Sequence, residues 1–581
     1  MKNYRIFNNA KVVMAALAMG AMATACSDWD DHYDANTSVI GSSSATLWEN
    51  IKANPNLSEF AQLATKAGYD KVLQSSQTFT VWAPLNGTFD FETLNNTDLT
   101  SVADLTNEFM RNHVAHFSYP ASGPINERVF MLNEKMNIFQ GNGTYQMGGV
   151  QLENANIPSC NGTLHTLGGK LKFNYNIFES LNNKTYALDS ITAYFDKYNY
   201  QELDLDASVK GPVVDGEITY LDSVTVDFNY MCNMLRTYID REDSTYTMIV
   251  PTNEGWNKAM ATLDNYYKYI PSYAYFKEFP QTLNSATANQ IDYELIDDAY
   301  LADSLKKLNI VMNLAYNNKY YGNVKLPALQ HGETLQTDSL VSINHEILYT
   351  EDAARLFGGT IAKEEKSNGY LWIADSLHIR PWNSWKPVVK VQGEMSSSVA
   401  ATFNGTTSRV SVNSINRNQN VEGILSNNAY AEIRPTSSSG NPEVDFYLDG
   451  VCAGKYMLYV AVVPANIDST MYVTSVLPNR MQVKCGYHNE KGKYVENTFK
   501  GYFENDVTKV DEVKIGEIEF PVSTAGLENA KPYVRLLSRV TSGISSKYDR
   551  TLRIDYIKLV PIELYDYLQE NPDYKYYQSL F

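Results

Sequence analysis

Cysteine and histidine are scarce in this chain, which has 5 cysteines and 8 histidines among 581 residues. So few cysteines exclude a scaffold held by disulfides, because such scaffolds are small and dense in cysteine. The chain contains no CxxC pair and no HExxH motif, so the sequence predicts no metal site. We expect Cys160, Cys232, Cys452 and Cys485 to be small buried residues, and a Cys452–Cys485 bridge is the alternative.

Positively charged residues are also fewer than negatively charged ones. Lys and Arg number 48 against 66 Asp and Glu, which gives a formal net charge of −18. Binding to nucleic acid needs a basic surface that neutralises phosphates, so the charge balance excludes nucleic acid as a partner.

Motifs of catalysis and of cofactor binding are missing. The chain has no nucleophile elbow, no phosphate-binding P-loop and no dinucleotide glycine fingerprint in context. The sequence therefore predicts no cofactor, no catalytic residue and no enzyme. A glycosidase needs only two carboxylates in a cleft, and no pair stands out among 66 acids. A glycan-active hydrolase in the C-terminal part is therefore an alternative.

Long hydrophobic runs are absent apart from a short one near the start. Residues 12–25 form an apolar run, and Lys2, Arg5 and Lys11 precede it. This run is too short to cross a bilayer as a helix, but it suits a signal peptide. We assign residues 1–25 to a signal peptide and expect no membrane-spanning segment.

The residues before Cys26 are the small residues Ala23, Thr24 and Ala25. This arrangement resembles the lipobox of bacterial lipoproteins. The resemblance implies cleavage before Cys26 and attachment of acyl chains to its sulfur and amine. A plain secretory signal that contains a cysteine is the alternative.

An acidic stretch follows Cys26 directly. Its members Asp28, Asp30 and Asp31 resemble the surface-export signal of Bacteroidota lipoproteins. The resemblance implies an outer-membrane protein that is lipid-anchored and faces the cell exterior, whereas a solvated acidic linker is the alternative. We expect residues 26–45 to be an acidic and serine-rich tether.

Two segments in the middle of the chain repeat one pattern. One reads TFTVWAPLNGTF from Thr78 to Phe89, and the other reads TYTMIVPTNEGW from Thr245 to Trp256. In each, an alternating β-rich run meets a proline, which ends the strand because it cannot donate to a ladder. The asparagine two residues later suits a helix cap or an Asx-turn.

Each of these segments is followed downstream by an Asn-Gly pair, at Asn161-Gly162 and at Asn368-Gly369. Asn-Gly is a turn signal, and the alternating run after each pair predicts a half-buried strand. Together the two patterns resemble the two signature segments of the fasciclin domain. The resemblance implies an α+β fold with two fasciclin-like domains, each a β-wedge with packed helices, at residues 46–176 and 177–380.

Apolar residues at helical spacing precede each first segment, at residues 47–67 and 228–239, and predict core-facing helices. Between the signatures of the first copy, residues 109–116 resemble the Tyr-His segment of the family, and we expect His113 to be a hydrogen-bonded core residue. The second copy is longer, and we place its insertion at residues 266–300. The many tyrosines there predict either a contact patch or extra helices.

The last third of the chain lacks helical periodicity. Short alternating runs separated by turn residues predict an all-β sandwich or jelly roll over residues 381–581. Its closing run, residues 552–561, resembles the last strand of carbohydrate-binding sandwiches. We expect Trp382 and Trp385 to join this domain to the preceding one. Candidate sugar-binding rings are Tyr430, Tyr487 and Tyr494.

Asp-Ser followed by an apolar residue or Thr resembles the O-glycosylation motif of Bacteroidota. Candidate acceptors are Ser190, Ser223, Ser244, Ser304, Ser339 and Ser469. Ser376 matches too, but it falls in a core strand signature.

These observations predict a non-enzymatic binding or adhesion module on the cell surface. It would be attached to the membrane through its lipid anchor and would bind a protein or glycan ligand. One form of this function is an accessory role in outer-membrane nutrient uptake, in which an outer-membrane transporter complex is the partner. A structural spacer or a partner subunit of an outer-membrane complex is the alternative.

Overall fold

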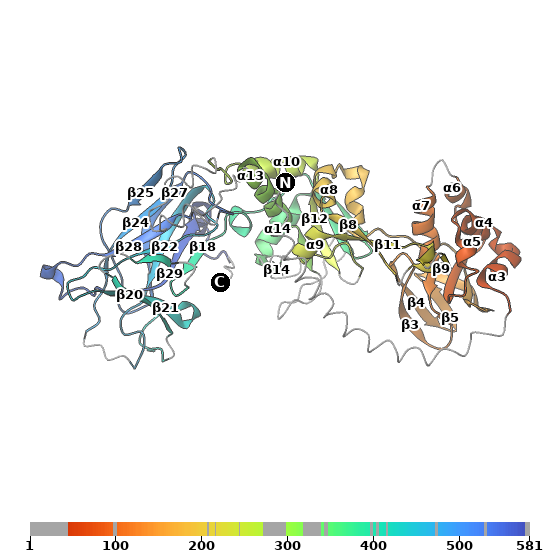
Figure 1. The fold of residues 1–581 in the computed structure, drawn as a ribbon, viewed down its shortest axis with the longest axis horizontal. Helices are drawn as coiled ribbons and strands as arrows, with labels where there is room; N and C mark the ends of the chain where they lie inside the picture. The colour runs from red at the N-terminus through yellow and green to blue at the C-terminus, as the bar shows by residue number, and fades with distance from the viewer. Residues whose placement is uncertain are drawn as a thin grey trace.

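The computed structural model describes residues 44–96, 101–205, 208–214, 217–242, 245–270, 298–317, 339–341, 347–395, 399–402, 406–413, 416–470, 475–527 and 531–575. Their cores divide them into an N-terminal unit (residues 44–175), a middle unit (176–380) and a C-terminal unit (381–575). The three units lie in a row along the longest axis (Figure 1). Cys26, Asp28, Asp30, Asp31 and Ser244 lie outside the described residues, as does most of the segment expected to hold the insertion.

The N-terminal unit is built on a seven-stranded sheet with the order β2-β1-β7-β6-β5-β4-β3. Its strands are β1 (Phe79–Pro84), β2 (Val114–His116), β3 (Ile125–Phe130), β4 (Met136–Asn142), β5 (Thr144–Met147), β6 (Val150–Ser159) and β7 (Gly162–Leu167). Its helices are α3 (Leu47–Ala53), α4 (Ser58–Lys66), α5 (Tyr69–Val72), α6 (Phe91–Asn95) and α7 (Val102–Asp104), followed by the π-helix η3 (Leu105–Met110) and the 3-10 helix η4 (Arg111–His113). Strands β1 and β7 are parallel and buried along their whole length, so they form the centre of the unit.

Side chains of β1 alternate between two cores, because successive residues of a strand point to opposite faces. Phe79 and Val81 face the core that helices α3–α5 cover, and Trp82 faces a second core with Phe139 of β4. The apolar stripe of residues 47–67 forms α3 and α4, as its periodicity predicts.

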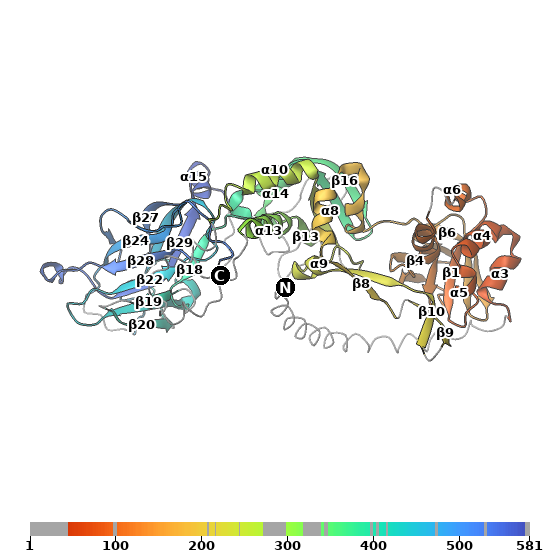
Figure 2. The same ribbon diagram turned by 45° about the horizontal axis from the view of Figure 1, so that its top comes forward.

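The middle unit contains a smaller sheet with the order β13-β12-β17-β16. Its strands are β12 (Tyr246–Pro251), β13 (Ala315–Asn317), β16 (Thr360–Lys366) and β17 (Gly369–Ala374), and a separate ribbon pairs β14 (Ser339–Val341) with β15 (Ile347–Tyr349). Its helices are α8 (Asp189–Asp196), α9 (Tyr230–Met234), α10 (Asn253–Leu263), α13 (Asp298–Val311) and α14 (Thr350–Gly358). Four strands, β8 (Asn199–Leu203), β9 (Val209–Val214), β10 (Glu217–Asp222) and β11 (Thr225–Asn229), form a long hairpin that reaches the N-terminal unit (Figure 2).

The central strand pair of the middle unit repeats that of the N-terminal unit residue for residue. Strand β1 pairs with β7 from Phe79–Gly162 to Pro84–Leu167, and β12 pairs with β17 from Tyr246–Gly369 to Pro251–Ala374. Both glycines have positive φ, 148° for Gly162 and 140° for Gly369. A Cβ on either would lie within 2 Å of the carbonyl oxygen of the opposite strand. Only glycine fits this position, because it alone lacks the Cβ.

The asparagine before each glycine makes the same contacts in both units. The Asn161 side-chain oxygen accepts from the Leu47 N–H, and its amide donates to two backbone carbonyls of residues 73 and 75. The Asn368 oxygen accepts from the Ile177 N–H, and its amide donates to the carbonyls of residues 239 and 241. Each asparagine therefore ties the start of its unit to the loop before the central strand.

Two local expectations from the sequence were wrong. Asn86 and Asn253 do not cap the helices that follow them; instead their oxygens accept from the N–H groups of Glu59 and Ser190, on preceding helices. The predicted helix of residues 228–239 is limited to α9, because Phe228 belongs to β11.

The C-terminal unit consists of two sheets around one core. One sheet has the order β20-β21-β29-β23-β27, with β18 paired to β29, and the other has the order β19-β22-β28-β24-β25, with β26 paired to β24. The strands are β18 (Val389–Gln392), β19 (Val399–Thr402), β20 (Thr406–Asn413), β21 (Ala429–Pro435), β22 (Glu443–Tyr447), β23 (Gly454–Val462), β24 (Arg480–His488), β25 (Tyr494–Thr498), β26 (Phe503–Glu504), β27 (Asp511–Phe520), β28 (Tyr533–Ser538) and β29 (Leu552–Pro561). Buried residues of both sheets pack in the shared core.

Two features of this unit differ from the expectations. It ends in a helix, α15 (Ile562–Glu570), so the unit is not all β. Cys452 and Cys485 are both free and buried, so they do not form the alternative bridge. In the part of the chain that the structure describes, no helix is both long and apolar enough to span a membrane.

We predict that Gly162→Ala destabilises the N-terminal unit by at least about 3 kcal/mol, because the new Cβ would collide with the Phe79 carbonyl oxygen. Gly87→Ala is the matched control, since Gly87 also has positive φ but has open space around it; it should cost only about 1–2 kcal/mol. Hydrogen exchange of β1 and β7 in the intact chain measures both. Equal protection in the two variants would contradict the argument.

Candidate functional site

Buried histidines of the N-terminal unit have structural rather than chemical roles. The His113 Nδ1–H donates to the Phe109 carbonyl, and its Nε2 accepts from the Leu171 N–H. His165 accepts from the Asn156 N–H through Nδ1 and donates to the carbonyl of residue 119 through Nε2. Burial lowers the pKa of both rings to about 4, so both are neutral at pH 7. His113 is the hydrogen-bonded core residue that the sequence predicts. Among the described residues no cluster of three or more His, Cys, Asp or Glu side chains is suited to a metal ion.

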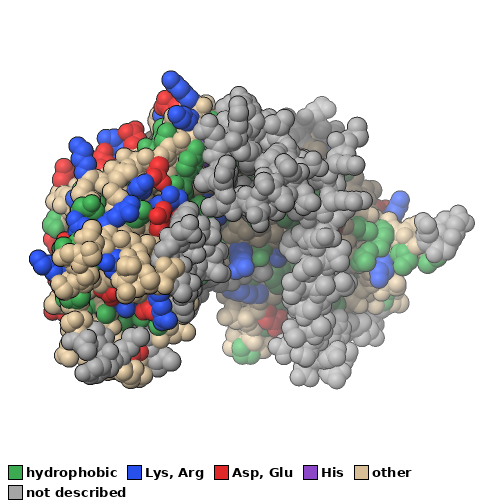
Figure 3. Space-filling model, turned by 60° about the vertical axis from the view of Figure 1, so that its left-hand side comes forward, with side chains coloured by type: hydrophobic (Ala, Val, Ile, Leu, Met, Phe, Trp, Pro, Cys, Tyr) green, Lys and Arg blue, Asp and Glu red, His purple; other side chains and the backbone are tan. Residues whose placement is uncertain are grey.

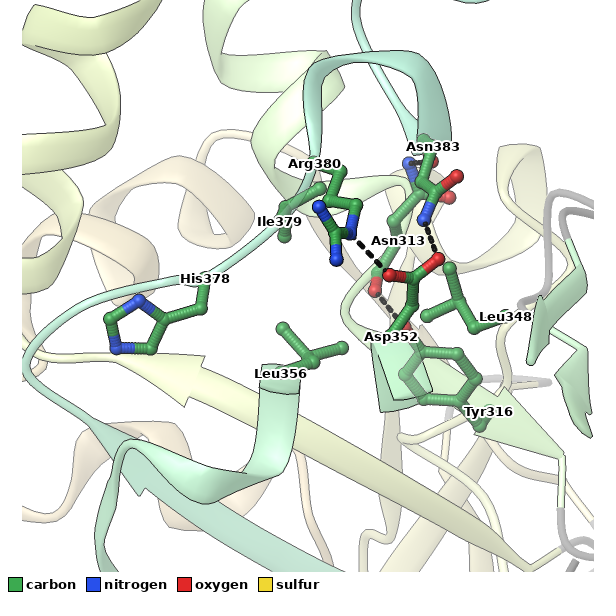
Figure 4. A pocket seen from close by; sticks show the side chains of 9 residues that line it. All are labelled: Asn313, Tyr316, Leu348, Asp352, Leu356, His378, Ile379, Arg380 and Asn383. Atoms are coloured by element: carbon green, nitrogen blue, oxygen red, sulfur yellow. Dashed lines mark hydrogen bonds and ion pairs between the residues drawn. The ribbon is translucent and has the colours of Figure 1, made fainter. Parts of the chain in front are cut away.

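One polar cluster joins the middle and C-terminal units (Figure 4). Asp352 of α14 lies at its centre and is 5% exposed. Its carboxylate accepts from Arg380 Nε at 2.5 Å, from the Asn383 amide at 2.7 Å and from the Tyr574 hydroxyl at 2.5 Å. Trp382 donates to the same Tyr574 hydroxyl, so the chain after α15 is fixed to the middle unit.

The cavity beside this cluster has a volume of about 10 Å³, roughly the space that one water molecule needs. The Asp352 carboxylate is neutralised by the adjacent Arg380 guanidinium, and the polar groups of the cluster face one another. The cluster is therefore a junction between units and has no room for a ligand. Trp382 packs on Met457 and Leu564 of its own unit, and the Arg380 guanidinium of the middle unit lies 5.3 Å from the centroid of its ring; Trp385 enters the middle core. Both tryptophans join the units, as expected.

A second polar region covers the outer face of the sheet β19-β22-β28-β24-β25. Alternate residues of its strands enter the core and are fully buried, among them Val444, Phe446, Val483 and Val534. The residues between them must point outward, because a strand has a period of two. The outward set contains Glu443, Asp445, Tyr447, Arg480, Gln482, Lys484, Gly486, His488, Tyr494, Glu496, Thr498, Tyr533, Arg535 and Leu537, and we call it the outer face.

The strand register aligns these side chains in two rows across the sheet. The aromatic row runs from Tyr447 to Tyr533, and Gly486 is the next residue along it. A Cβ at Gly486 would lie 2.3 Å from the Tyr494 hydroxyl oxygen and 2.5 Å from the Tyr533 ring, so glycine makes room for both rings. Tyr494 stacks on Tyr533 at 5.9 Å between ring centroids, and Tyr447 meets Tyr533 edge-on at 6.2 Å.

The charged row lies beside the aromatic row. Arg535 binds Asp445 through two hydrogen bonds, of 2.6 and 2.8 Å, and approaches Glu443 and Glu496 at 3.4 and 3.3 Å. Lys484 binds Glu496 at 2.6 Å, and Tyr533 donates to the same carboxylate. Burial raises the pKa of Asp445 despite the guanidinium. For Glu496, burial is outweighed by the bonds from Lys484 and Tyr533, and its pKa is lowered.

The outer face combines aromatic rings with charged groups that are paired with one another. Each carboxylate of the charged row is held by Arg535 or Lys484. Aromatic faces next to polar groups suit a sugar ring, whose CH face stacks while its hydroxyls form hydrogen bonds. Over the part of the C-terminal unit seen in Figure 3, positive and negative side chains are interspersed.

Of the three tyrosines that the sequence singled out, only Tyr494 lies on the outer face. Tyr430 is fully buried in a core with Ile467, so it cannot stack on a ligand. Tyr487 points into the shared core and meets Phe520 edge-on. Tyr447 and Tyr533 were not foreseen, although their alternation with Phe446 and Val534 follows from the period of two.

The predicted acceptor serines lie in different settings. Ser223 and Ser469 are exposed, and Ser190 and Ser304 are half-buried in α8 and α13. Ser339 is the first residue of β14. Their modification stays a prediction.

Comparison with known proteins identifies one part of the chain. Residues 55–171 match the family model of the Fasciclin domain. This part of the chain is thus a Fasciclin domain, with the mixed helices and strands described above, and it indicates an adhesion-like or binding module. No curated protein sequence matches the chain at a significant level.

Three solved structures that resemble parts of the chain are distant from it in sequence. A pair of FAS1 domains from the insect cell adhesion molecule Fasciclin I is 14% identical, with a TM-score of 0.20; the match covers 56% of this chain and 98% of that one. A Paenibacillus xanthan lyase is 15% identical, with a TM-score of 0.20, over 29% of this chain and 13% of that one. A carbohydrate-binding module that recognises mannan is 13% identical, with a TM-score of 0.14, over 28% of this chain and 95% of that one.

We predict that Arg535→Met destabilises the C-terminal unit by about 3–5 kcal/mol, because it leaves the buried Asp445 carboxylate without its cation. Lys484→Met is the control on the same face, and it should cost less than about 1 kcal/mol because its ion pair is more exposed. Hydrogen exchange of β22 and β28 in the intact chain gives both values. Similar losses in the two variants would show that Asp445 does not depend on Arg535.

Proposed function

We propose that this protein is a non-enzymatic binding module on the cell surface, and that the outer face of its C-terminal unit binds a glycan. The Fasciclin domain at residues 55–171 supports the general part of this proposal. The repeated strand register and the repeated Asn-Gly contacts support a second, divergent fasciclin-like domain at residues 177–380. The two sheets around one core support a sandwich or jelly-roll domain at residues 381–581.

The observation that carries the glycan proposal is the aromatic row beside the charged row. Tyr447 and Tyr494 are half-buried and flank the buried Tyr533, so their rings are fixed in place but still accessible. Fixed rings bind at little cost in conformational entropy. The charged row next to them offers the exposed Glu496 carboxylate and the half-buried Lys484 ammonium group, which are partners for sugar hydroxyls. A shallow strip of this kind favours binding over turnover.

The attachment and the location follow from the sequence before the described residues. We propose that acyl chains on Cys26 anchor the protein in the outer membrane, and that Asp28, Asp30 and Asp31 direct it to the exterior. A binding module in that position would capture glycan or peptide for an outer-membrane transporter, which is then a partner.

A spacer is the second candidate function, and the arrangement of the units favours it. The three units lie in a row, so the C-terminal unit is far from the Fasciclin domain, which is the first domain after Cys26 in the sequence (Figure 1). An elongated protein of this kind could hold a partner away from the membrane without binding a glycan.

We predict that the intact protein binds a subset of glycans on an array, and that Tyr447→Ala combined with Tyr494→Ala weakens this binding about tenfold or more, because the stacking rings are lost. Tyr300→Ala is the matched control, because Tyr300 is 70% exposed on α13 of the middle unit. An array without any bound glycan, or equal binding by all variants, would leave the spacer as the function.

We predict that mass spectrometry finds the mature protein beginning at Cys26 with acyl chains attached. Cys26→Ser should move the protein out of the membrane fraction, whereas Cys160→Ser, at an exposed cysteine, should not. Replacing Asp28, Asp30 and Asp31 by Ala should keep the lipid but protect the protein from protease added to intact cells. A mature terminus elsewhere would contradict the anchor.

A further inference from the structure

We propose that the hairpin of residues 199–229 is an arm that locks the N-terminal and middle units into one rigid pair, and that the Asp222–Arg111 ion pair is its catch. The arm is the part of the middle unit that extends toward the N-terminal unit in Figure 2. This inference is independent of the proposed glycan binding, since it concerns how two other units are held.

The base of the arm is fixed to the middle unit. The Asn229 side-chain oxygen accepts from the Cys232 N–H and caps α9. Its amide donates to the Phe195 carbonyl at 2.8 Å and to the Asn199 side-chain oxygen at 2.7 Å. The arm therefore leaves the middle unit in a defined direction.

The arm has no core of its own. All five residues of β8 are exposed, and β8 pairs only with β11 among the described strands. Farther along the arm, Leu205, Val213 and Ile218 are each more than half exposed. An isolated two-stranded ribbon is at best marginally stable in water. Contact with the N-terminal unit must therefore supply much of the order of the arm.

That contact includes the Asp222 carboxylate, the buried Val209 side chain and a hydrogen bond between the side chains of Asp204 and Glu134. Asp222 accepts two hydrogen bonds from Arg111, of 2.5 and 3.1 Å, and one of 2.7 Å from the Tyr69 hydroxyl. Arg111 also donates to the Ser223 carbonyl. Val209 is fully buried and belongs to the core of the N-terminal unit. A carboxylate with three hydrogen bonds has a single favourable position, so the arm cannot slide.

A second contact lies apart from the catch. Lys135, in the turn between β3 and β4, is 6% exposed and binds Glu179 at 2.6 Å and Glu242 at 2.7 Å, both in the middle unit. A single contact would act as a pivot, but two separate contacts resist rotation about either one. The two units are therefore held at a fixed angle.

The lock can open without unfolding either unit. Among the described residues, Val209 is the only residue from beyond the N-terminal unit in the core clusters of that unit. The other contacts named here are ion pairs and hydrogen bonds at the surface of two separately cored units. Breaking them leaves both cores intact and frees the angle between the units.

The test measures the distance between two nitroxide labels by pulsed electron spin resonance in the intact chain. One label goes on the exposed native Cys160 of the N-terminal unit and the other on Asn257→Cys, an exposed position of α10. Cys26→Ser removes the fifth cysteine, and Cys232, Cys452 and Cys485 are buried, so none of these positions competes for label in the folded protein. We expect one narrow distance distribution in the otherwise unchanged protein.

Asp222→Asn removes the charge of the catch, and we expect it to broaden this distribution at least twofold while hydrogen exchange of β1 and β7 is unchanged. Glu202→Gln, at an exposed position of β8, is the control on the same arm and should keep the narrow distribution. Should Asp222→Asn unfold the N-terminal unit, Lys135→Met opens the second contact and must broaden the distribution instead. A broad distribution in the unchanged protein, or a narrow one in the variants that fold, would overturn the proposal.

Discussion

The N-terminal and middle units both depend on the close approach of a glycine to the backbone of the opposite strand. At Gly162 and Gly369 there is no room for a Cβ against the carbonyl oxygens of Phe79 and Tyr246. This approach sets the register of a parallel pair that is buried along its length. The preceding asparagines then satisfy backbone groups at the start of each unit and in the loop before the central strand. The Asn-Gly pair thus sets the register of the central strands and connects the start of the unit to the loop before the central strand.

The three units are joined in two physically different ways. The middle and C-terminal units share apolar cores, since Cys452 of one lies among the buried residues of the other and Ile270 packs on Val522 and Leu527. The N-terminal and middle units have separate cores and meet through ion pairs and one buried valine. Apolar burial is non-directional and hard to open locally, whereas a polar catch is directional and can be released. The chain therefore combines a permanent joint with a releasable one.

Much of this fold could be predicted from the sequence, because the signals were local. The alternating run before Pro84, its copy before Pro251 and the two Asn-Gly pairs each marked an element that the structure contains. The arm was missed, although Asp215-Gly216 is a strong hairpin signal between β9 and β10. Its strands are largely exposed and are ordered by a partner unit distant in the sequence, which no local pattern reveals.

The candidate site was less predictable because it depends on which face of the sheet each residue of a strand points to. A tyrosine in a strand lies in the core or on the surface according to one residue of register. Tyr430 and Tyr494 look equivalent in the sequence, but the first fills a core and the second stacks on Tyr533. The charged row adds a constraint that composition cannot show: Asp445 is 1% exposed, so Arg535 must stay beside it and cannot turn freely toward a ligand. The half-buried rings of Tyr447 and Tyr494 beside this row are therefore the part of the outer face on which the proposed glycan would stack.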